Sequence, residues 1–175
     1  PYLEKSISVS PSITSMPDKV PALEEEGEPA GYSLLVVEDT TDMLEFLAKN
    51  LGNTYTIHTA ANGKEALECL ETTTVDLIIS DIVMPHMDGF ELLKSIRSDN
   101  MLCHIPFILL SALDSIDSKI AGLDYGADAY IEKPFSLSHM KATINNLLEN
   151  RRMLFNHFTT VPNMSYDQTL MNKTD

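Results

Sequence analysis

Short apolar runs alternate with amphipathic stretches through the middle of this chain, and no other feature constrains its fold as strongly. An uninterrupted run such as Leu34–Val37 is typical of a strand that is buried on both faces of a sheet. Apolar residues near helical spacing follow each run. The pattern predicts strands over residues 34–37, 55–60, 77–80, 107–110 and 129–131, and helices over residues 43–51, 62–70, 88–96, 116–123 and 136–148.

This order of elements predicts the architecture as well. Strands that alternate with helices favour a parallel sheet, and right-handed crossovers distribute the helices over both of its faces. We therefore expect an α/β fold: a doubly wound, five-stranded parallel sheet within a three-layer α/β/α sandwich of the flavodoxin-like kind.

Local signals support several of the helix ends. Asn62 stands three residues before a glutamate, and Asp88 does the same, which is the spacing of a capping box. Ser136 is placed to cap the final helix, and Gly126 to follow the end of the preceding one.

Composition excludes some classes of function. The chain carries 26 acidic residues against 12 Lys and Arg, a formal charge of −14, so binding to nucleic acid or to an anionic membrane is not expected of it. It has no apolar stretch of the roughly 20 residues that a membrane helix needs. Cys69 and Cys103 form no disulfide framework. We expect reduced thiols and a cytoplasmic location.

The two ends of the chain differ from its middle. Residues 1–30 are rich in Pro, Ser and Glu and predict a flexible acidic linker before a domain over residues 31–150. Residues 151–175 are interpreted as a helical extension, marked by Phe155 and Phe158, and a linker to a missing output domain. Such an extension would serve dimerisation or signalling. The chain begins with Pro1, so we interpret it as part of a longer protein.

Acidic residues follow two of the predicted strands. Glu38 and Asp39 come directly after the first strand and Asp81 after the third. Acids such as Glu38 and Asp39 at a helix start are also favoured by the helix dipole and by capping, and Asp81 alone would be a turn residue, so each position has a structural explanation. In a parallel sheet, however, the ends of neighbouring strands share one crevice. Three carboxylates gathered there repel one another unless a cation lies among them or a pKa is raised, and oxygen ligands suit magnesium.

A hydroxyl and an ammonium are expected at the same edge. Ser111, with Ala112 next to it, follows the fourth strand, and Lys133 follows the fifth. Taken alone, Ser111 would be an ordinary turn residue, and neutralisation of the acids would be a sufficient structural role for Lys133. Together with a cation they suit a phosphate site in which an aspartate is itself the acceptor.

The same residues carry a resemblance to a known family. The chain resembles the receiver domain of two-component response regulators over about residues 31 to 150. The match rests on Glu38-Asp39, on Asp81 with Met84-Pro-x-Met-Asp-Gly89, on Ser111-Ala112, and on Tyr130-x-x-Lys133-Pro134-Phe135.

The resemblance implies a role for each residue. Asp81 is the phosphoacceptor for the phosphohistidine of a histidine kinase. Magnesium is bound directly by Asp39 and Asp81, through water by Glu38, and by the backbone carbonyl of Val83. Phosphate is held by Ser111, Ala112 and Lys133, with a cis peptide between Lys133 and Pro134. Tyr130 turns inward when Ser111 moves toward the phosphate, which switches a protein-interaction surface.

Further expectations concern partners and turnover. The partners are a histidine kinase domain and an output domain, presumed to act in transcription, or a second copy of the chain. The flanks resemble those of receivers in hybrid regulators, which combine a receiver with a kinase core. Val83 and Leu113 are apolar at positions that border the path of attacking water in receivers, so we expect slow self-hydrolysis of the phosphoaspartate and no other enzymatic activity.

Three alternatives stay open at this point. A magnesium-dependent aspartyl-phosphate phosphatase usually has a second acid two residues after its nucleophile, where this chain has Val83. A flavin-binding domain needs a first loop that cradles phosphate, which Glu38 and Asp39 would repel. A receiver that no longer switches would act as an interaction module only.

Overall fold

The computed structural model describes residues 31–112, 120–121 and 124–159. The predicted linker over residues 1–30, most of the predicted helix over residues 116–123, and Leu113 lie outside this part of the chain. The elements are β1 (Ser33–Val37), α1 (Thr41–Leu51), β2 (Thr56–Ala60), α2 (Gly63–Thr72), β3 (Leu77–Asp81), α3 (Gly89–Ser98), β4 (Phe107–Ser111), β5 (Ala129–Glu132) and α5 (Leu137–Thr159).

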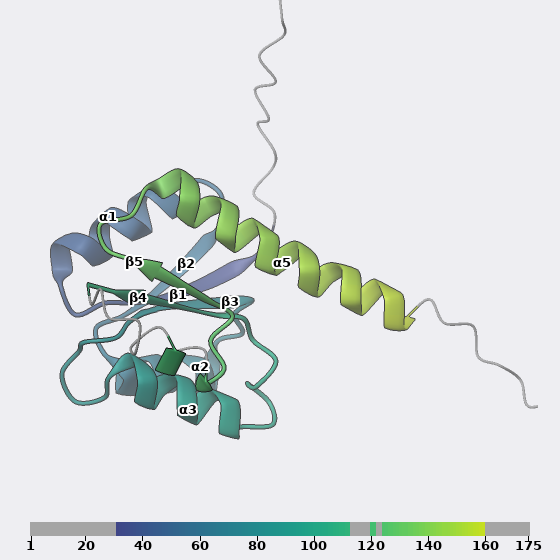
Figure 1. The fold of residues 1–175 in the computed structure, drawn as a ribbon, viewed down its shortest axis with the longest axis horizontal. Coiled ribbons are helices and arrows are strands. Elements are labelled where there is room, and N and C mark those ends of the chain that lie inside the picture. Colours follow the sequence, from purple (N-terminus) through teal and green to yellow (C-terminus); the bar gives the residue numbers. More distant parts are fainter. Residues whose placement is uncertain (1–30, 113–119, 122–123, 160–175) are drawn as a thin grey trace, which may run out of the picture.

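The strands form one parallel sheet in the order β2-β1-β3-β4-β5. Helices α1 and α5 cover one face of this sheet, and α2 and α3 cover the other (Figure 1). Because the strand order reverses direction next to β1, the carboxyl ends of β1 and β3 border the crevice where such sheets bind ligands. The predicted doubly wound α/β sandwich is confirmed.

Two apolar layers hold the sandwich together, and they follow from the alternation of side chains along each strand. Leu35, Leu109 and their equivalents pack with α2 and α3. Leu34, Ile108 and their equivalents pack with α1 and α5 through Leu47 and Met140, among others. Each such side chain that becomes fully buried contributes about 1.5–3 kcal/mol, so both layers are needed for a stable fold.

The caps agree with the sequence, with one variation. Asp88 and Glu91 form the predicted capping box of α3, and the Ser136 hydroxyl accepts from the N–H of His139 at the start of α5. Asn62 caps α2 by accepting from the N–H groups of the second and third helical residues. Glu65, however, accepts from the N–H of Ala61, one residue before the cap. The reciprocal bond is therefore shifted by one residue.

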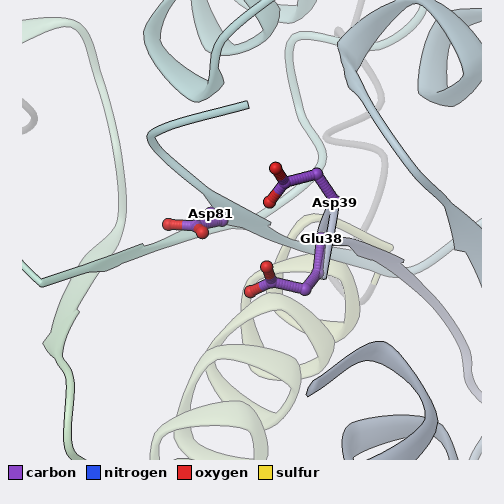
Figure 2. Close-up of side chains that lie close together, drawn as sticks. All are labelled: Glu38, Asp39 and Asp81. Carbon is purple, nitrogen blue, oxygen red and sulfur yellow. The ribbon is translucent and has the colours of Figure 1, made fainter. Parts of the chain in front are cut away.

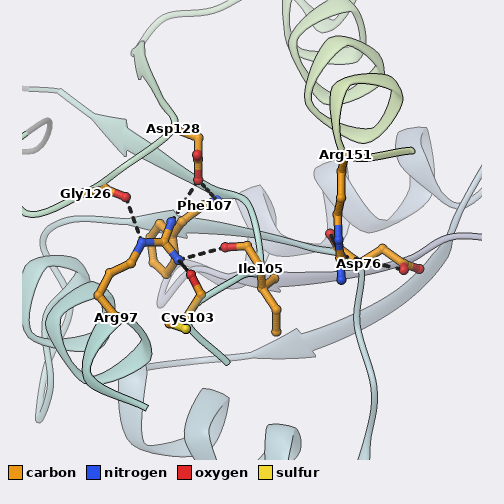
Figure 3. A network of polar contacts seen from close by, with 8 residues as sticks. All are labelled: Asp76, Arg97, Cys103, Ile105, Phe107, Gly126, Asp128 and Arg151. Atoms are coloured by element: carbon orange, nitrogen blue, oxygen red, sulfur yellow. Dashed lines mark hydrogen bonds and ion pairs between the residues drawn. The ribbon is translucent and has the colours of Figure 1, made fainter. Parts of the chain in front are cut away.

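A side chain of α3 connects the amino-terminal ends of β4 and β5 (Figure 3). The Arg97 guanidinium donates to the carbonyls of Gly126, Cys103 and Ile105 and to the Asp128 carboxylate, at 2.8–3.1 Å. The same Asp128 oxygen accepts from the N–H of Phe107, the first residue of β4. Gly126 has a φ of +92°, as expected of a residue that follows a helix end. This network fixes the sheet edge opposite to the one where the predicted site lies.

Helix α5 is the longest element and runs past the sheet (Figure 1). Its last fully packed side chain is Leu148. Beyond it, Arg151 donates to the backbone carbonyl of Asp76 at 3.0 Å, and Phe155 and Phe158 are 69% and 75% exposed. Among the described helices, α5 included, every one is too short or too polar to cross a membrane.

Candidate functional site

The site residues predicted from the sequence stand at the carboxyl ends of four strands. Glu38 and Asp39 follow β1, Asp81 ends β3, Ser111 ends β4, and Lys133 follows β5. Because these strands are parallel neighbours in the order β1-β3-β4-β5, all of these residues lie at one edge of the sheet.

The three acids come together. Carboxylate oxygens of Glu38, Asp39 and Asp81 lie within 4.8 Å of one another (Figure 2). Glu38 and Asp81 are buried and Asp39 is exposed. The cluster thus has a closed inner side and one member that faces solvent, which gives a cation a way in.

Lys133 closes the inner side of the cluster. Its Nζ donates to Glu38 Oε2 at 2.8 Å and to Asp81 Oδ2 at 2.9 Å. The three side chains are only 19%, 0% and 11% exposed, so water screens these contacts weakly. The main chain is held as well, because the N–H of Lys133 donates to the Ser111 carbonyl at 2.7 Å. The peptide between Lys133 and Pro134 is cis, as the resemblance implied.

The side-chain alternation of the strands explains why these three residues meet. Leu34 and Val36 line the layer next to α1 and α5, and Glu38 is the next residue of that series. Ile79 lies in the same layer two residues before Asp81, and Ile131 lies there two residues before Lys133. Since alternate residues of a strand share a face, all three polar side chains continue one apolar layer beyond its edge.

The pairing with Lys133 acts differently on the two buried acids. Burial raises the pKa of Glu38, but the hydrogen bonds from Lys133 and from the N–H of Thr40 outweigh it, so this pKa lies below its ordinary value. Burial also raises the pKa of Asp81. Lys133 opposes that rise, but the charge of Glu38 adds to it, and the pKa of Asp81 stays above its ordinary value. Burial lowers the pKa of Lys133, and its two carboxylate partners raise it further than burial lowers it.

Two backbone groups complete the site, and the sequence analysis assigned them no role. The N–H of Thr40 donates to Glu38 Oε1 at 3.1 Å, and the N–H of Ile82 donates to Asp81 Oδ1 at 2.7 Å. Each group lies one or two residues after the acid that it contacts. The position of each acid at a strand end could have predicted these contacts, because a chain that turns there directs its next N–H groups back toward the carboxylate.

The remaining predicted residues surround this centre. Leu110 pairs with Asp81 across β3 and β4, so Ser111 is the next residue along, and it is buried. Glu132 pairs with Ser111, and Tyr130 stands two residues earlier on β5, so Ser111 and Tyr130 are diagonal neighbours on one face. Ala112 is exposed. Val83 lies in the loop after β3 with 67% exposure.

The donor set fits a hard divalent cation. The three acidic side chains offer only carboxylate oxygens as ligands, and the charge of Lys133 offsets one of their three negative charges, which leaves an excess for a cation to neutralise. Mg²⁺ prefers such carboxylates together with several waters, and the exposed side of Asp39 leaves room for water.

Comparisons with known proteins identify the family of the chain. Residues 34–145 match the family model of the response regulator receiver domain. The chain is 35% identical over 164 residues to Histidine kinase P4 of Formosa agariphila, which covers 90% of this chain and 12% of that protein. It is 37% identical over 121 residues to Response regulator MprA of Mycobacterium ulcerans, covering 69% of this chain and 51% of that protein. It thus spans about half or less of the length of these relatives.

A solved structure gives the same result. The receiver domain of a signal transduction histidine kinase from Syntrophus aciditrophicus is 36% identical, with a TM-score of 0.65, over 69% of this chain and 92% of that one. The family model covers more than half of the chain, and the solved receiver domain shares its fold. The chain belongs to the family of response regulator receiver domains.

Proposed function

We propose that Asp81 accepts a phosphoryl group from the phosphohistidine of a histidine kinase domain. The observation that carries this proposal is the convergence of three carboxylates and the Lys133 ammonium at the ends of β1, β3 and β5. A carboxylate is a competent nucleophile at neutral pH, and phosphoryl transfer depends mainly on positioning and on neutralisation of charge.

The transfer joins one Asp81 carboxylate oxygen to phosphorus. The P–N bond of the phosphohistidine breaks, and its electron pair returns to the imidazole nitrogen. Asp81 Oδ1 is already engaged by the backbone N–H of Ile82, whereas Oδ2 contacts only the Lys133 side chain among the contacts described above. We therefore assign the attack to Oδ2. Lys133 then moves from the carboxylate to an oxygen of the phosphoryl group, which Ser111 and the N–H of Ala112 also hold.

The residues that would hold Mg²⁺ are Asp39 and Asp81 directly, Glu38 through water, and Val83 through its backbone carbonyl. Bound there, the ion neutralises the incoming phosphoryl oxygens. Glu38 accepts hydrogen bonds on both oxygens, from Lys133 and from Thr40, which suits a residue that acts through water better than a direct ligand.

Ser111 and Tyr130 are proposed to report the phosphorylated state. Ser111 moves toward the new phosphate oxygens, and its diagonal neighbour Tyr130 turns into the space that it leaves. Tyr130 lines a pocket of about 380 Å³ with Glu132, Phe135 and His139. Rotation of its ring changes this surface, which lies between β5 and the start of α5.

The phosphorylated state is proposed to be long-lived. The exposed Val83 side chain has no group that can orient an attacking water. The second residue behind this expectation, Leu113, lies outside the described part of the chain. Decay of radiolabelled protein over minutes or longer is the expected result, and decay within seconds contradicts it.

We further propose that this receiver, over residues 31–150, belongs to a hybrid histidine kinase. The similarity to Histidine kinase P4 covers 90% of the chain, more than residues 34–145 of the family match, so it includes part of the flanks. Residues 151–175 would lead to an output domain that controls transcription, and Phe155 and Phe158 would meet that domain or a second copy. The cytoplasmic location stays a prediction.

The test is incubation with acetyl phosphate and Mg²⁺, followed by intact-protein mass spectrometry. The expected result is a gain of one phosphoryl group that requires Mg²⁺ and is lost in Asp81→Asn. Asp88→Asn is the matched control, because Asp88 caps α3 outside the acidic cluster. No adduct in the unmodified chain, or an adduct that survives Asp81→Asn, overturns the proposal.

A further inference from the structure

The loop of residues 82–88 follows Asp81 and folds back tightly onto the end of β3. The N–H of Gly89 donates to the Ile82 carbonyl at 2.8 Å. A Cβ atom on Gly89 would lie 2.2 Å from the carbonyl oxygen of Asp81, so only glycine fits there. The inner end of the loop is thereby fixed by its own backbone.

The outer end of the loop is fixed by a different element. Met87 lies over Gly63, the first residue of α2, and a Cβ atom on Gly63 would lie only 2.5 Å from Met87 Cγ. The N–H of Gly63 also donates to the Met87 carbonyl at 3.2 Å. The Met87 side chain is partly buried and packs against the apolar layer under α2 and α3. Both its backbone and its side chain therefore hold the loop to α2.

The loop conformation needs such a support. His86, directly before Met87, has a φ of +67°, which is an uncommon conformation for a residue other than glycine. Conformations of this kind persist where the surrounding structure holds them. The contact of Met87 with Gly63 is a restraint from outside the loop, and it acts on the residue next to His86.

The second acid-bearing loop rests on the same segment. The N–H of Glu38 donates to the carbonyl of Ala60, the last residue of β2, at 3.1 Å. Residues 60–63 thus contact both the Glu38–Asp39 turn and the loop that follows Asp81. The relative position of the two loops is set by this short connection, although it contributes no carboxylate to the cluster.

We propose that Met87 is a positioning residue for the cation site. Seated over Gly63, it fixes the loop of residues 82–88, and with it the Val83 backbone and the Asp81 carboxylate, relative to Glu38 and Asp39. This inference rests on the proposed function. Residues that support metal ligands typically change metal affinity by about 10–100-fold when they are removed. We expect a loss near the lower end, about tenfold, because Met87 acts through the backbone.

The test is a Mg²⁺ titration of the unphosphorylated full chain, in which binding is monitored by NMR of the backbone amides. Met87→Ala is expected to raise the half-saturating Mg²⁺ concentration about tenfold, and Gly63→Ala to do the same because it displaces Met87. Met87→Leu, which refills the space, should bind within about twofold of the unmodified chain. Met101→Ala and Gly31→Ala are the controls, because Met101 is 78% exposed and nothing lies within 4 Å of Gly31.

A second measurement follows the contact between Met87 and Gly63 directly. In Met87→Ala the Gly63 amide should exchange with deuterium faster, whereas amides in β1 and β3 keep their protection. Unchanged half-saturation in both Met87→Ala and Gly63→Ala overturns the inference. So does loss of the folded state in both, because Met87 would then be a general packing residue. Failure of the unmodified chain to bind Mg²⁺ is a different result, since it removes the proposed function itself.

Discussion

Replacing Asp81 by asparagine should stabilise this protein in the absence of a divalent cation. The substitution keeps the size of the side chain and the acceptor for the N–H of Ile82. It removes one charge from the buried group of Glu38, Asp81 and Lys133, in which two carboxylates share one ammonium. The isosteric change Glu38→Gln, made in the same cluster, should have the opposite effect.

The magnitude follows from the distances. At an effective dielectric of about 20, the 2.9 Å contact between Lys133 and Asp81 gives about 6 kcal/mol of attraction. Repulsion from Glu38, whose nearest carboxylate oxygen is within 4.8 Å, removes about 3.5 kcal/mol of it or more. Desolvation of a buried carboxylate costs several kcal/mol, which exceeds the remainder. We expect Asp81→Asn to be more stable by roughly 2 kcal/mol, or about 8 °C in Tm for a domain of this size.

The dependence on pH gives the sign independently. The folded-state pKa of Asp81 is raised, so its contribution to stability is present below the ordinary carboxyl pKa and is lost as pH rises through the folded value. The folded-state pKa of Glu38 is lowered, so its contribution is present above the ordinary pKa and is lost as pH falls through the folded value. The advantage of Asp81→Asn and the deficit of Glu38→Gln should both shrink in acid.

Urea denaturation followed by far-UV circular dichroism measures these differences. It is run with EDTA at pH 7.5 and at pH 4, and then with saturating Mg²⁺. The cation should stabilise the unmodified chain and stabilise Asp81→Asn less, which narrows the gap. An Asp81→Asn chain that is less stable than the unmodified one at pH 7.5 in EDTA would refute the reasoning. The reasoning would also be refuted if Asp81→Asn and Glu38→Gln changed the free energy of unfolding in the same direction.

Three other substitutions test the fold around the site. Gly89→Ala should cost about 3 kcal/mol or more in urea denaturation, because its Cβ would clash with the Asp81 carbonyl oxygen; a loss below about 1 kcal/mol contradicts the close approach. Arg97→Met should cost about 2–4 kcal/mol, because it leaves several acceptors without a donor, whereas the exposed Arg152→Met should stay within about 0.5 kcal/mol; equal losses would count against the network. Burial raises the pKa of Tyr55, so its contribution to stability is present below the ordinary pKa and is lost as pH rises above it; Tyr55→Phe should unfold less readily than the unmodified chain in alkaline titrations, and identical alkaline transitions would contradict this.

The sequence predicted the fold because each strand carried its own evidence. Runs such as Leu77–Ser80 have no polar residue before their last position, each is followed by helical spacing, and three of the helices also carry a cap signal. The strand bounds in the structure differ from the predicted ones by a single residue, as for β5, which includes Glu132. The polar residues of the site were visible for the same reason, since they interrupt the apolar pattern where a strand ends.

What the sequence could not predict depends on contacts between distant residues. The acids and the lysine were expected at one edge of the sheet. Lys133 pairs with Glu38 and Asp81, however, because these side chains lie on the same face of the sheet, and that depends on the positions of the strand ends. The support of Met87 on Gly63 joins the loop after β3 to the first residue of α2 and has no local signal.

Helix α5 would convert a rearrangement at the carboxyl end of the sheet into a displacement beyond its amino end. It starts four residues after Lys133 and, as a helix of 23 residues, extends for about 34 Å. Such a rod behaves as a lever whose pivot is the packing of Met140, Ile144 and Leu148. A tilt of about 5° at its base would shift its far end by about 3 Å, given that length. The exposed rings of Phe155 and Phe158 lie at that end. An Ångström-scale rearrangement around a phosphate would therefore change the orientation of a domain that contacts them.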